Sequence, residues 1–239
     1  DTEQQGFVTR YTHVTYGLGF IVTDEAIEDD QYMVIAENRA RALAFSMRTT
    51  KELQAADIYN RAFTGGPTYG DGVSLLNSAH PNVAGGTWSN ILATASDLSE
   101  AALEQACIDI MRFKNDRGLN IAVMPSTLIV SPEDAFNAMR ILQSPLQNNT
   151  ANNAINALKA SGKFLGEVVV NPYLAVPSGG LIPWFVRTNV PNGMKHLERR
   201  ADAFTEDNDF DTDNLKYKAT ARYSFGATDP RGLFGSPGV

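Results

Sequence analysis

The chain has 239 residues, a mass of 26.0 kDa and a formal net charge of −7, from 20 Lys and Arg against 27 Asp and Glu. Hydrophobic residues make up 43% of it, which is enough for one or two folded domains and excludes disorder by composition. No run of about 18 apolar residues occurs, so a membrane-spanning helix is not expected. The acidic balance argues against a protein that holds nucleic acid by electrostatic attraction.

The single cysteine, Cys107, excludes an intramolecular disulfide and a zinc site made of cysteines alone. Its surroundings, AALEQACIDIMRF, form an apolar helical pattern, which predicts a buried structural thiol and not a nucleophile. The N-terminus carries neither a signal-peptide pattern nor an initiator Met, so we expect a processed, truncated or renumbered chain. This cysteine usage fits synthesis in a reducing cytoplasm.

The N-terminal segment 7–22, FVTRYTHVTYGLGFIV, is rich in β-branched and aromatic residues and predicts an extended strand. Apolar residues occur on both of its faces, which favours an arm over a core strand. We expect this arm to become ordered mainly against a neighbouring subunit, because an isolated strand leaves its backbone groups unpaired. Gly17 and Gly19 are then expected at the point where the arm flexes.

A long segment without Gly or Pro, residues 20–64, follows the arm. Strong helix formers predict a helix over about 24–62, stopped by Gly65-Gly66-Pro67. At 1.5 Å per residue this helix would be roughly 58 Å long, whereas a compact globule of this size is roughly 45 Å across. The helix is therefore expected either to break near Thr49-Thr50 or to belong to a flat molecule.

The remaining pattern mixes helices and strands without a βαβ repeat, which predicts an α+β protein. The clearest strand is 215–225, LKYKATARYSF, where apolar and polar residues alternate with period two. The other predicted elements are a helix over 98–114 capped by Ser99, a strand over 121–130, a helix from Ser131-Pro132-Glu133 to about Leu142, a short helix ending at Lys159, and strands within 162–172 and 181–188.

No catalytic, cofactor-binding or metal site is predicted. Gly17-x-Gly19 lacks the rest of a dinucleotide fingerprint. The three histidines, His13, His80 and His196, occur in unrelated contexts, and a triad drawn from Ser78 and His80 lacks the turn that a nucleophilic serine needs. His80-Pro81 therefore predicts a turn. The Gly65–Gly72 segment predicts a flexible loop, with an anion cradle as the alternative.

An acidic run, Glu206 to Asp213, precedes the last strand. It lacks the central Gly and bidentate Glu of an EF-hand, so a solvated loop without structural metal is the first expectation. Salt bridges across a subunit boundary and a cation site remain as alternatives.

Several segments occur together in a recognisable order: YGLGFIVTDEAIEDD, DGVSLLNSAHP, SDLSEAALEQACIDIMRFKNDRGL, VSPEDAFNAMRIL and DTDNLKYKATARYSFGATDPRGLFG. In this order, from about Gly6 to Gly235, the chain resembles a Mu-type phage major head subunit, a major capsid protein with the Hong Kong 97-like fold. The resemblance implies a structural, non-enzymatic protein without cofactors. It also implies an α+β fold with an extended loop, a long spine helix, a peripheral domain and an axial domain.

The resemblance also implies a domain division and partners. Residues 1–23 would form the extended-loop strand or arm, 24–87 the peripheral domain with the spine helix, 88–200 the axial domain, and 201–239 the return strand of the peripheral domain. Copies of the chain would form pentamers and hexamers in an icosahedral shell around double-stranded DNA, without sequence-specific binding or a membrane. Cement, scaffolding and portal proteins are further expected partners, with assembly in the bacterial host cytoplasm and a final place in the virion capsid.

Two alternatives stay open. An encapsulin-type nanocompartment would have a related shell but enclose protein, so the cargo separates it from a phage head. A small cytosolic hydrolase or cation-binding domain would have a mass near 26 kDa or a small multiple, whereas a shell protein forms megadalton particles.

Overall fold

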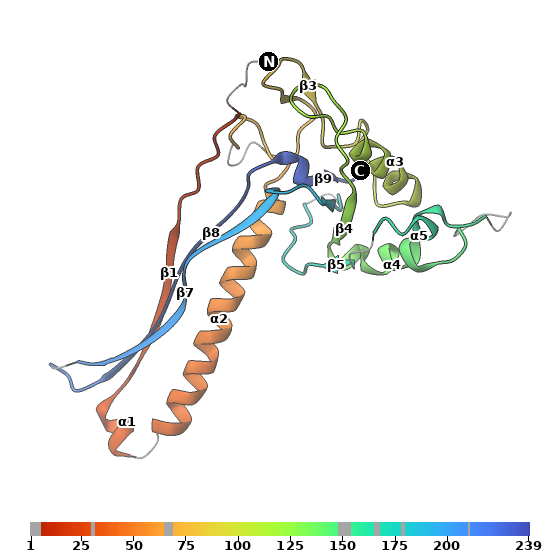
Figure 1. Cartoon of the computed structure of the whole chain (residues 1–239). Coiled ribbons are helices and arrows are strands. Elements are labelled where there is room, and N and C mark those ends of the chain that lie inside the picture. Colours follow the sequence, from red (N-terminus) through yellow and green to blue (C-terminus); the bar gives the residue numbers. More distant parts are fainter. Residues whose placement is uncertain are drawn as a thin grey trace. The chain divides into compact units, whose positions relative to one another are not determined.

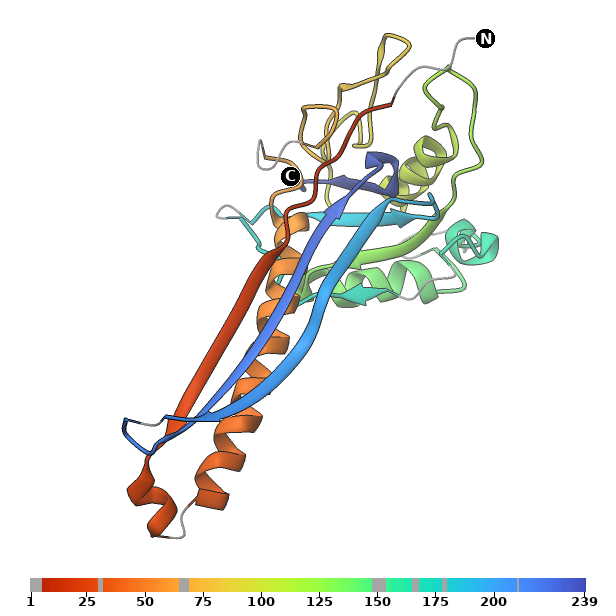
Figure 2. The same ribbon diagram turned by 60° about the vertical axis from the view of Figure 1, so that its left-hand side comes forward.

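The computed structural model describes residues 6–29, 32–64, 69–147, 154–164, 168–177, 180–209 and 211–239 (Figures 1 and 2). The chain forms two compact units, each built from segments that are far apart in the sequence. The large unit contains Asp1–Arg10, Ala56–Lys195 and Ala227–Val239, and the small unit contains Tyr11–Ala55 and His196–Gly226. Mixed helices and sheets make the protein α+β, as predicted.

The small unit is a three-stranded sheet with one long helix along a face (Figure 2). The strand order is β1-β8-β7, with β1 at Val14–Val22, β7 at Met194–Asn208 and β8 at Leu215–Ala227. The helices are α1, Asp24–Glu28, and α2, Tyr32–Asn60.

The helix α2 packs on the sheet through a narrow apolar face. Leu43 and Met47 are buried against Ala219, Ala221 and Tyr223 of β8. The alternation predicted for 215–225 is therefore confirmed, because these β8 side chains are buried against the helix, whereas Thr220 and Arg222 between them are half-buried and Lys216 and Lys218 before them are exposed.

The prediction of an arm ordered against a neighbour is wrong for β1. Val14–Val22 pairs antiparallel with β8 of the same chain, from Val14 opposite Tyr223 to Val22 opposite Leu215. Gly17 and Gly19 lie inside this strand and not at a flexing point. A Cβ on Gly19 would come within 2.6 Å of the Tyr217 carbonyl oxygen, so glycine here permits close approach of two strands.

The predicted long helix is present as α1 and α2, and the alternative break near Thr49-Thr50 does not occur. Both threonines direct their hydroxyls back into the helix. Thr49 Oγ1 donates to the Phe45 carbonyl at 2.9 Å, and Thr50 Oγ1 donates to the Ser46 carbonyl at 2.9 Å. Their polar groups are thus satisfied within α2, so the weak local propensity does not interrupt it.

The large unit is built on a four-stranded sheet of order β5-β4-β6-β9. Its strands are β4 (Pro125–Val130), β5 (Val169–Val170), β6 (Trp184–Thr188) and β9 (Leu233–Ser236). β5 is parallel to β4, whereas β4 with β6 and β6 with β9 are antiparallel. The helices are α3 (Glu100–Met111), α4 (Ala135–Gln143) and α5 (Ala157–Ser161), with 3-10 turns η1 (Pro132–Asp134) and η2 (Pro230–Gly232). A small hairpin pairs β2 (His80–Pro81) with β3 (Thr87–Trp88).

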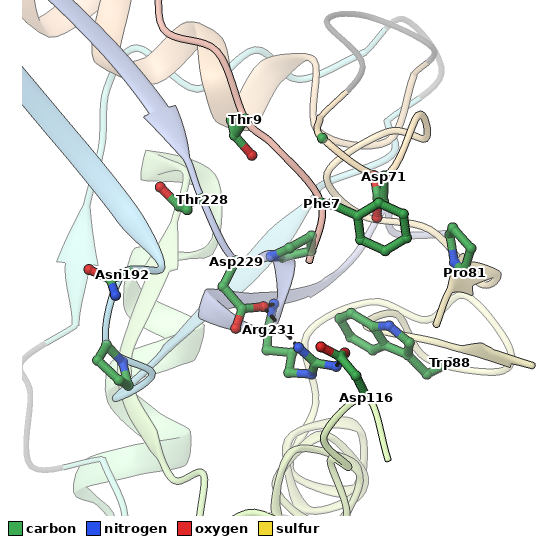
Figure 3. A pocket seen from close by; sticks show the side chains of 13 residues that line it. Phe7, Thr9, Asp71, Pro81, Trp88, Asp116, Asn192, Thr228, Asp229 and Arg231 are labelled. Atoms are coloured by element: carbon green, nitrogen blue, oxygen red, sulfur yellow. Dashed lines mark hydrogen bonds and ion pairs between the residues drawn. The ribbon is translucent and has the colours of Figure 1, made fainter. Parts of the chain in front are cut away.

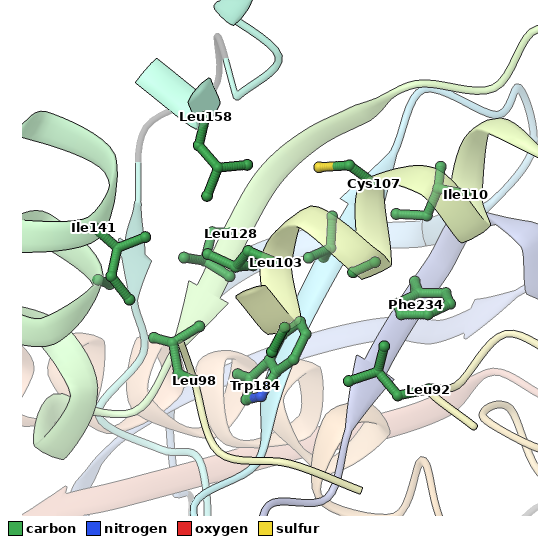
Figure 4. Packing of buried hydrophobic residues seen from close by; sticks show 14 of the residues in the cluster. Leu92, Leu98, Leu103, Cys107, Ile110, Leu128, Ile141, Leu158, Trp184 and Phe234 are labelled. Atoms are coloured by element: carbon green, nitrogen blue, oxygen red, sulfur yellow. The ribbon is translucent and has the colours of Figure 1, made fainter. Parts of the chain in front are cut away.

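Both faces of this sheet are covered. On one face Leu128, Trp184 and Phe234 pack with α3, α4 and α5 (Figure 4). On the other face Ile129 and Phe185 pack with the C-terminal end of α2 and the segment that carries Leu75 and Leu76. Trp184, Phe185 and Val186 of β6 point alternately to the two faces of the sheet. Because both faces are buried, the sequence of β6 is a continuous apolar run.

Most predicted elements of the large unit exist, but several are shorter. Ser99 caps α3 by accepting from the Ala102 amide at 3.2 Å. The helix predicted from Ser131 begins with η1 and continues as α4, with Pro at its first turn. Of the described residues in 162–172, only Val169–Val170 are in a strand.

The strand β7 was not predicted. Seven of its fifteen residues are charged, so no apolar alternation marks it. Glu206 and Asp207 consequently end a strand, which corrects the expectation that the whole acidic run is a loop.

Candidate functional site

The described residues do not bring the histidines together. His80 is buried in the large unit. In the small unit His13 Nδ1 lies 3.4 Å from Ser224 Oγ, while His196 stacks on Phe225. Ser78 is exposed and does not contact His80, so the triad drawn from these two residues is not formed. In the same described part of the chain, no three His, Cys, Asp or Glu side chains lie close enough to hold a metal ion, and no helix could span a membrane.

His80 and Pro81 form the short strand β2, so the predicted turn is wrong at these residues. The His80 side chain is buried in a cluster of polar groups. Asp71 Oδ2 lies 2.6 Å from His80 Nδ1, and Asn90 Oδ1 lies 3.0 Å from His80 Nε2. The orientation of Asn90 follows from its amide nitrogen, whose two hydrogens are shared among three carbonyl acceptors, those of Leu75 (2.7 Å), Pro230 (3.1 Å) and Leu233 (3.3 Å). Its oxygen must therefore face His80, so Nε2 donates to Asn90 while Nδ1 faces the carboxylate.

Asn90 links its own segment to two others in the large unit. Its side-chain oxygen also accepts from the Asn77 amide at 2.9 Å, so this one side chain is hydrogen-bonded to both the segment at 75–80 and the C-terminal segment at 230–233. The Asn90 side chain is buried, and its hydrogen bonds satisfy backbone carbonyls at the start of β9.

A pocket of about 260 Å³ lies beside this cluster (Figure 3). Arg231 is held in it over the Trp88 ring, 4.8 Å from the ring centroid. Its guanidinium also pairs with Asp116 at 2.7 Å and with Asp229 at 3.5 Å. Among the described residues that line the pocket, Arg231 is the one cation, and two carboxylates neutralise it. This arrangement holds the loops together and offers a ligand no unpaired cation from that set.

The acidic run lies at one end of the small unit. Lys216 pairs with Asp209 at 2.6 Å, and this hydrogen bond, followed by that from Thr212, lowers the pKa of Asp209. The Asp24 amide donates to Asn214 Oδ1 at 3.1 Å, which brings the start of α1 next to the turn after β7. Phe210 and residues 65–68 of the predicted glycine-rich loop lie outside the described residues.

Large apolar side chains are exposed on two helices. Phe45 of α2 and Phe136 of α4 are each 71% exposed, and Val34, Leu53 and Met139 are exposed on the same helices. Exposed aromatic side chains of this size are typical of surfaces that another protein covers. Sequence periodicity alone could not show this, because it does not tell which face of α2 or α4 is buried.

Cys107 is buried in the α3 core, as predicted (Figure 4). Burial raises the pKa of its thiol to about 11, and nearby Lys163 offsets this only in part. At about pH 8 roughly one thiol in a thousand is ionised, so it is a poor nucleophile.

We therefore expect Cys107 to resist iodoacetamide at about pH 8 while the protein is folded and to be alkylated fully in denaturant, as measured by mass spectrometry. A Ser78→Cys variant provides the control, because this exposed position should be alkylated quickly in the folded state. Rapid labelling of Cys107 in the folded protein would show that α3 opens readily.

Comparison with known proteins identifies the class. Residues 6–235 match the sequence family described as phage capsid protein. No curated protein matches. The capsid of Myoviridae phage XM1 is 13% identical, with a TM-score of 0.56 over 96% of this chain and 74% of that chain. The mature capsid of bacteriophage PhiM1 is 13% identical, with a TM-score of 0.53 over 99% and 76%. The holo-SrpI encapsulin complex from Synechococcus elongatus is 10% identical, with a TM-score of 0.54 over 95% and 73%.

The chain belongs to the phage capsid protein family, since the match spans nearly all of it. The predicted Hong Kong 97-like fold is confirmed, because capsids of phages XM1 and PhiM1 share the fold at low sequence identity. The protein is a major capsid protein, a structural subunit that assembles with copies of itself into the shell of a virion.

Proposed function

We propose that the chain is the Mu-type major head subunit of a tailed phage, forming pentamers and hexamers of an icosahedral shell around double-stranded DNA. The observation that carries this proposal is the family match over residues 6–235. Exposed Phe45 and Phe136 support it, because both side chains need a covering partner.

In this proposal the four segments have distinct roles. Residues 1–23 serve as the extended-loop strand, 24–87 as the peripheral domain with the spine helix α2, 88–200 as the axial domain, and 201–239 as the return strand. The shell assembles in the host cytoplasm with scaffolding, portal and cement proteins, and the subunit needs no cofactor and catalyses no reaction.

The proposal is tested by expressing the chain and imaging the purified material by electron microscopy. We expect closed megadalton particles with five-fold vertices, whereas material near 26 kDa would contradict the proposal. DNA inside particles isolated from phage-producing cells would support a phage head.

The second candidate is an encapsulin-type compartment, favoured by the structural likeness to the SrpI encapsulin. It predicts closed particles that contain protein cargo and no genomic DNA. Mass spectrometry and nuclease-protected DNA from the same particles separate the two candidates.

A further inference from the structure

Carboxylates gather at one end of the small unit, where α1 and the β7–β8 turn meet through the bond from the Asp24 amide to Asn214. We call this group the acidic tip: Asp24, Glu25, Glu28, Asp29, Glu206, Asp207, Asp209, Asp211 and Asp213. All except Asp209 are exposed. Among the described residues, the acidic tip forms one ion pair, between Asp209 and Lys216.

Two arginines, one on each of the neighbouring strands β7 and β8, point to the sheet face that α2 does not cover. Glu198 and Asp202 of β7 pair with Lys51 of α2, so Arg199 between them points to the opposite face. By the same alternation, Arg222 points away from α2, because Ala221 and Tyr223 pack against it. We call Arg199 and Arg222 the arginine pair.

The arginine pair forms no ion pair within the part of the chain that the structure describes. The Nε of Arg222 is buried and has no hydrogen-bond acceptor there. An unsatisfied buried donor is costly, so the Arg222 guanidinium gains from an added acceptor. Arg222 as a whole is half-buried and Arg199 is exposed, so both side chains remain accessible to a partner outside the chain.

The tip of the same chain does not supply this partner. Arg222 lies seven positions from the start of β8, and Arg199 lies seven positions from Glu206, the nearest tip residue on its own strand. At about 3.3 Å per residue each separation is roughly 23 Å, more than twice the screening length of about 8 Å at physiological salt.

We propose that the acidic tip of one copy docks on the arginine pair of a second copy in the assembled shell. The inference rests on the proposed shell function and names one of its contacts. Tip and arginine pair are different surfaces with opposite charge, so the contact is head-to-tail and joins successive copies, as a closed shell requires. It also lets a chain with a net charge of −7 associate with itself.

A charge exchange tests this contact. The tip variant is Glu206→Lys with Asp211→Lys, and the pair variant is Arg199→Glu with Arg222→Glu. We expect each to lower the particle yield about tenfold or more, measured by light scattering and electron microscopy. The combined variant has the wild-type net charge and is expected to yield about threefold or more as many particles as either parent variant, because the two introduced lysines then face the two introduced glutamates at the contact. Full recovery is not expected, since the other seven carboxylates of the tip are unchanged.

The control is Glu52→Lys with Glu133→Lys, which makes the same charge change at two exposed sites outside the tip. Its yield should stay near that of the wild type, whereas an equal loss would overturn the inference in favour of a net-charge effect. Thermal melting of the free subunits checks folding, and Arg199→Glu alone replaces the pair variant if the loss of Arg222 prevents folding.

Other outcomes separate the inference from the shell function. Wild-type protein without particles would overturn both. Wild-type particles with no recovery in the combined variant would overturn the inference alone. If the pair variant forms normal particles that lose DNA, the arginines bind nucleic acid and the inference is overturned. If wild-type particles dissociate in chelator and recover with calcium, the tip binds a cation and the inference is likewise overturned.

Discussion

Asn90→Ala is expected to lower the free energy of unfolding by about 3–5 kcal/mol, because it leaves several buried polar groups without partners at about 1–3 kcal/mol each. The carbonyls of Leu75 and Leu233 lose their donor, and the Asn77 amide and His80 Nε2 lose their acceptor. The total stays below a simple sum because water can enter the space that the side chain vacates.

Urea unfolding of the free subunit measures this effect. Asn82→Ala, in the loop between β2 and β3, is the matched control, since Asn82 Oδ1 has no hydrogen-bond partner among the described residues. It should change stability by less than about 1 kcal/mol. Equal effects of the two variants would show that the bonds of Asn90 contribute little to folding.

Ala44→Pro is expected to cost about 3 kcal/mol or more and to prevent particle assembly, because proline removes one helical hydrogen bond and clashes with the preceding turn. Ala44 is exposed in the middle of α2, so the substitution removes no core packing of its own. Its effect acts through neighbouring Leu43 and Met47, whose packing on β8 requires an unbroken helix.

Circular dichroism and particle yield measure this second effect. Ala44→Gly is the control, because it keeps the backbone N–H and should cost about 1 kcal/mol. Normal particles from Ala44→Pro would contradict a continuous α2 in the assembled shell.

Local patterns in the sequence were sufficient for much of the fold. The absence of Gly and Pro predicted α2, the Ser99 cap predicted the start of α3, and the period-two alternation predicted β8. Cys107 was correctly placed in the core from its helical neighbours. These signals succeed because each depends on residues within one or two turns or a few strand positions.

The pairing of β1 and the existence of β7 required the folded chain. β1 pairs with β8, about 200 positions later in the chain, and no local pattern in β1 indicates which strand that partner is. β7 is a charged edge strand, so it lacks the apolar alternation by which strands are recognised.

The polar cluster around His80 shows the same division between local and distant information. The dipeptide His80-Pro81 predicts a turn, yet in the fold His80 is fully buried between Asp71 and Asn90. Asn90 in turn bonds Pro230 and Leu233, about 140 positions away. Secondary structure follows from short-range sterics and periodicity that a sequence displays directly. The partners of a buried polar group depend on the distant segments that the packed core brings within hydrogen-bond distance, and the local sequence does not display them.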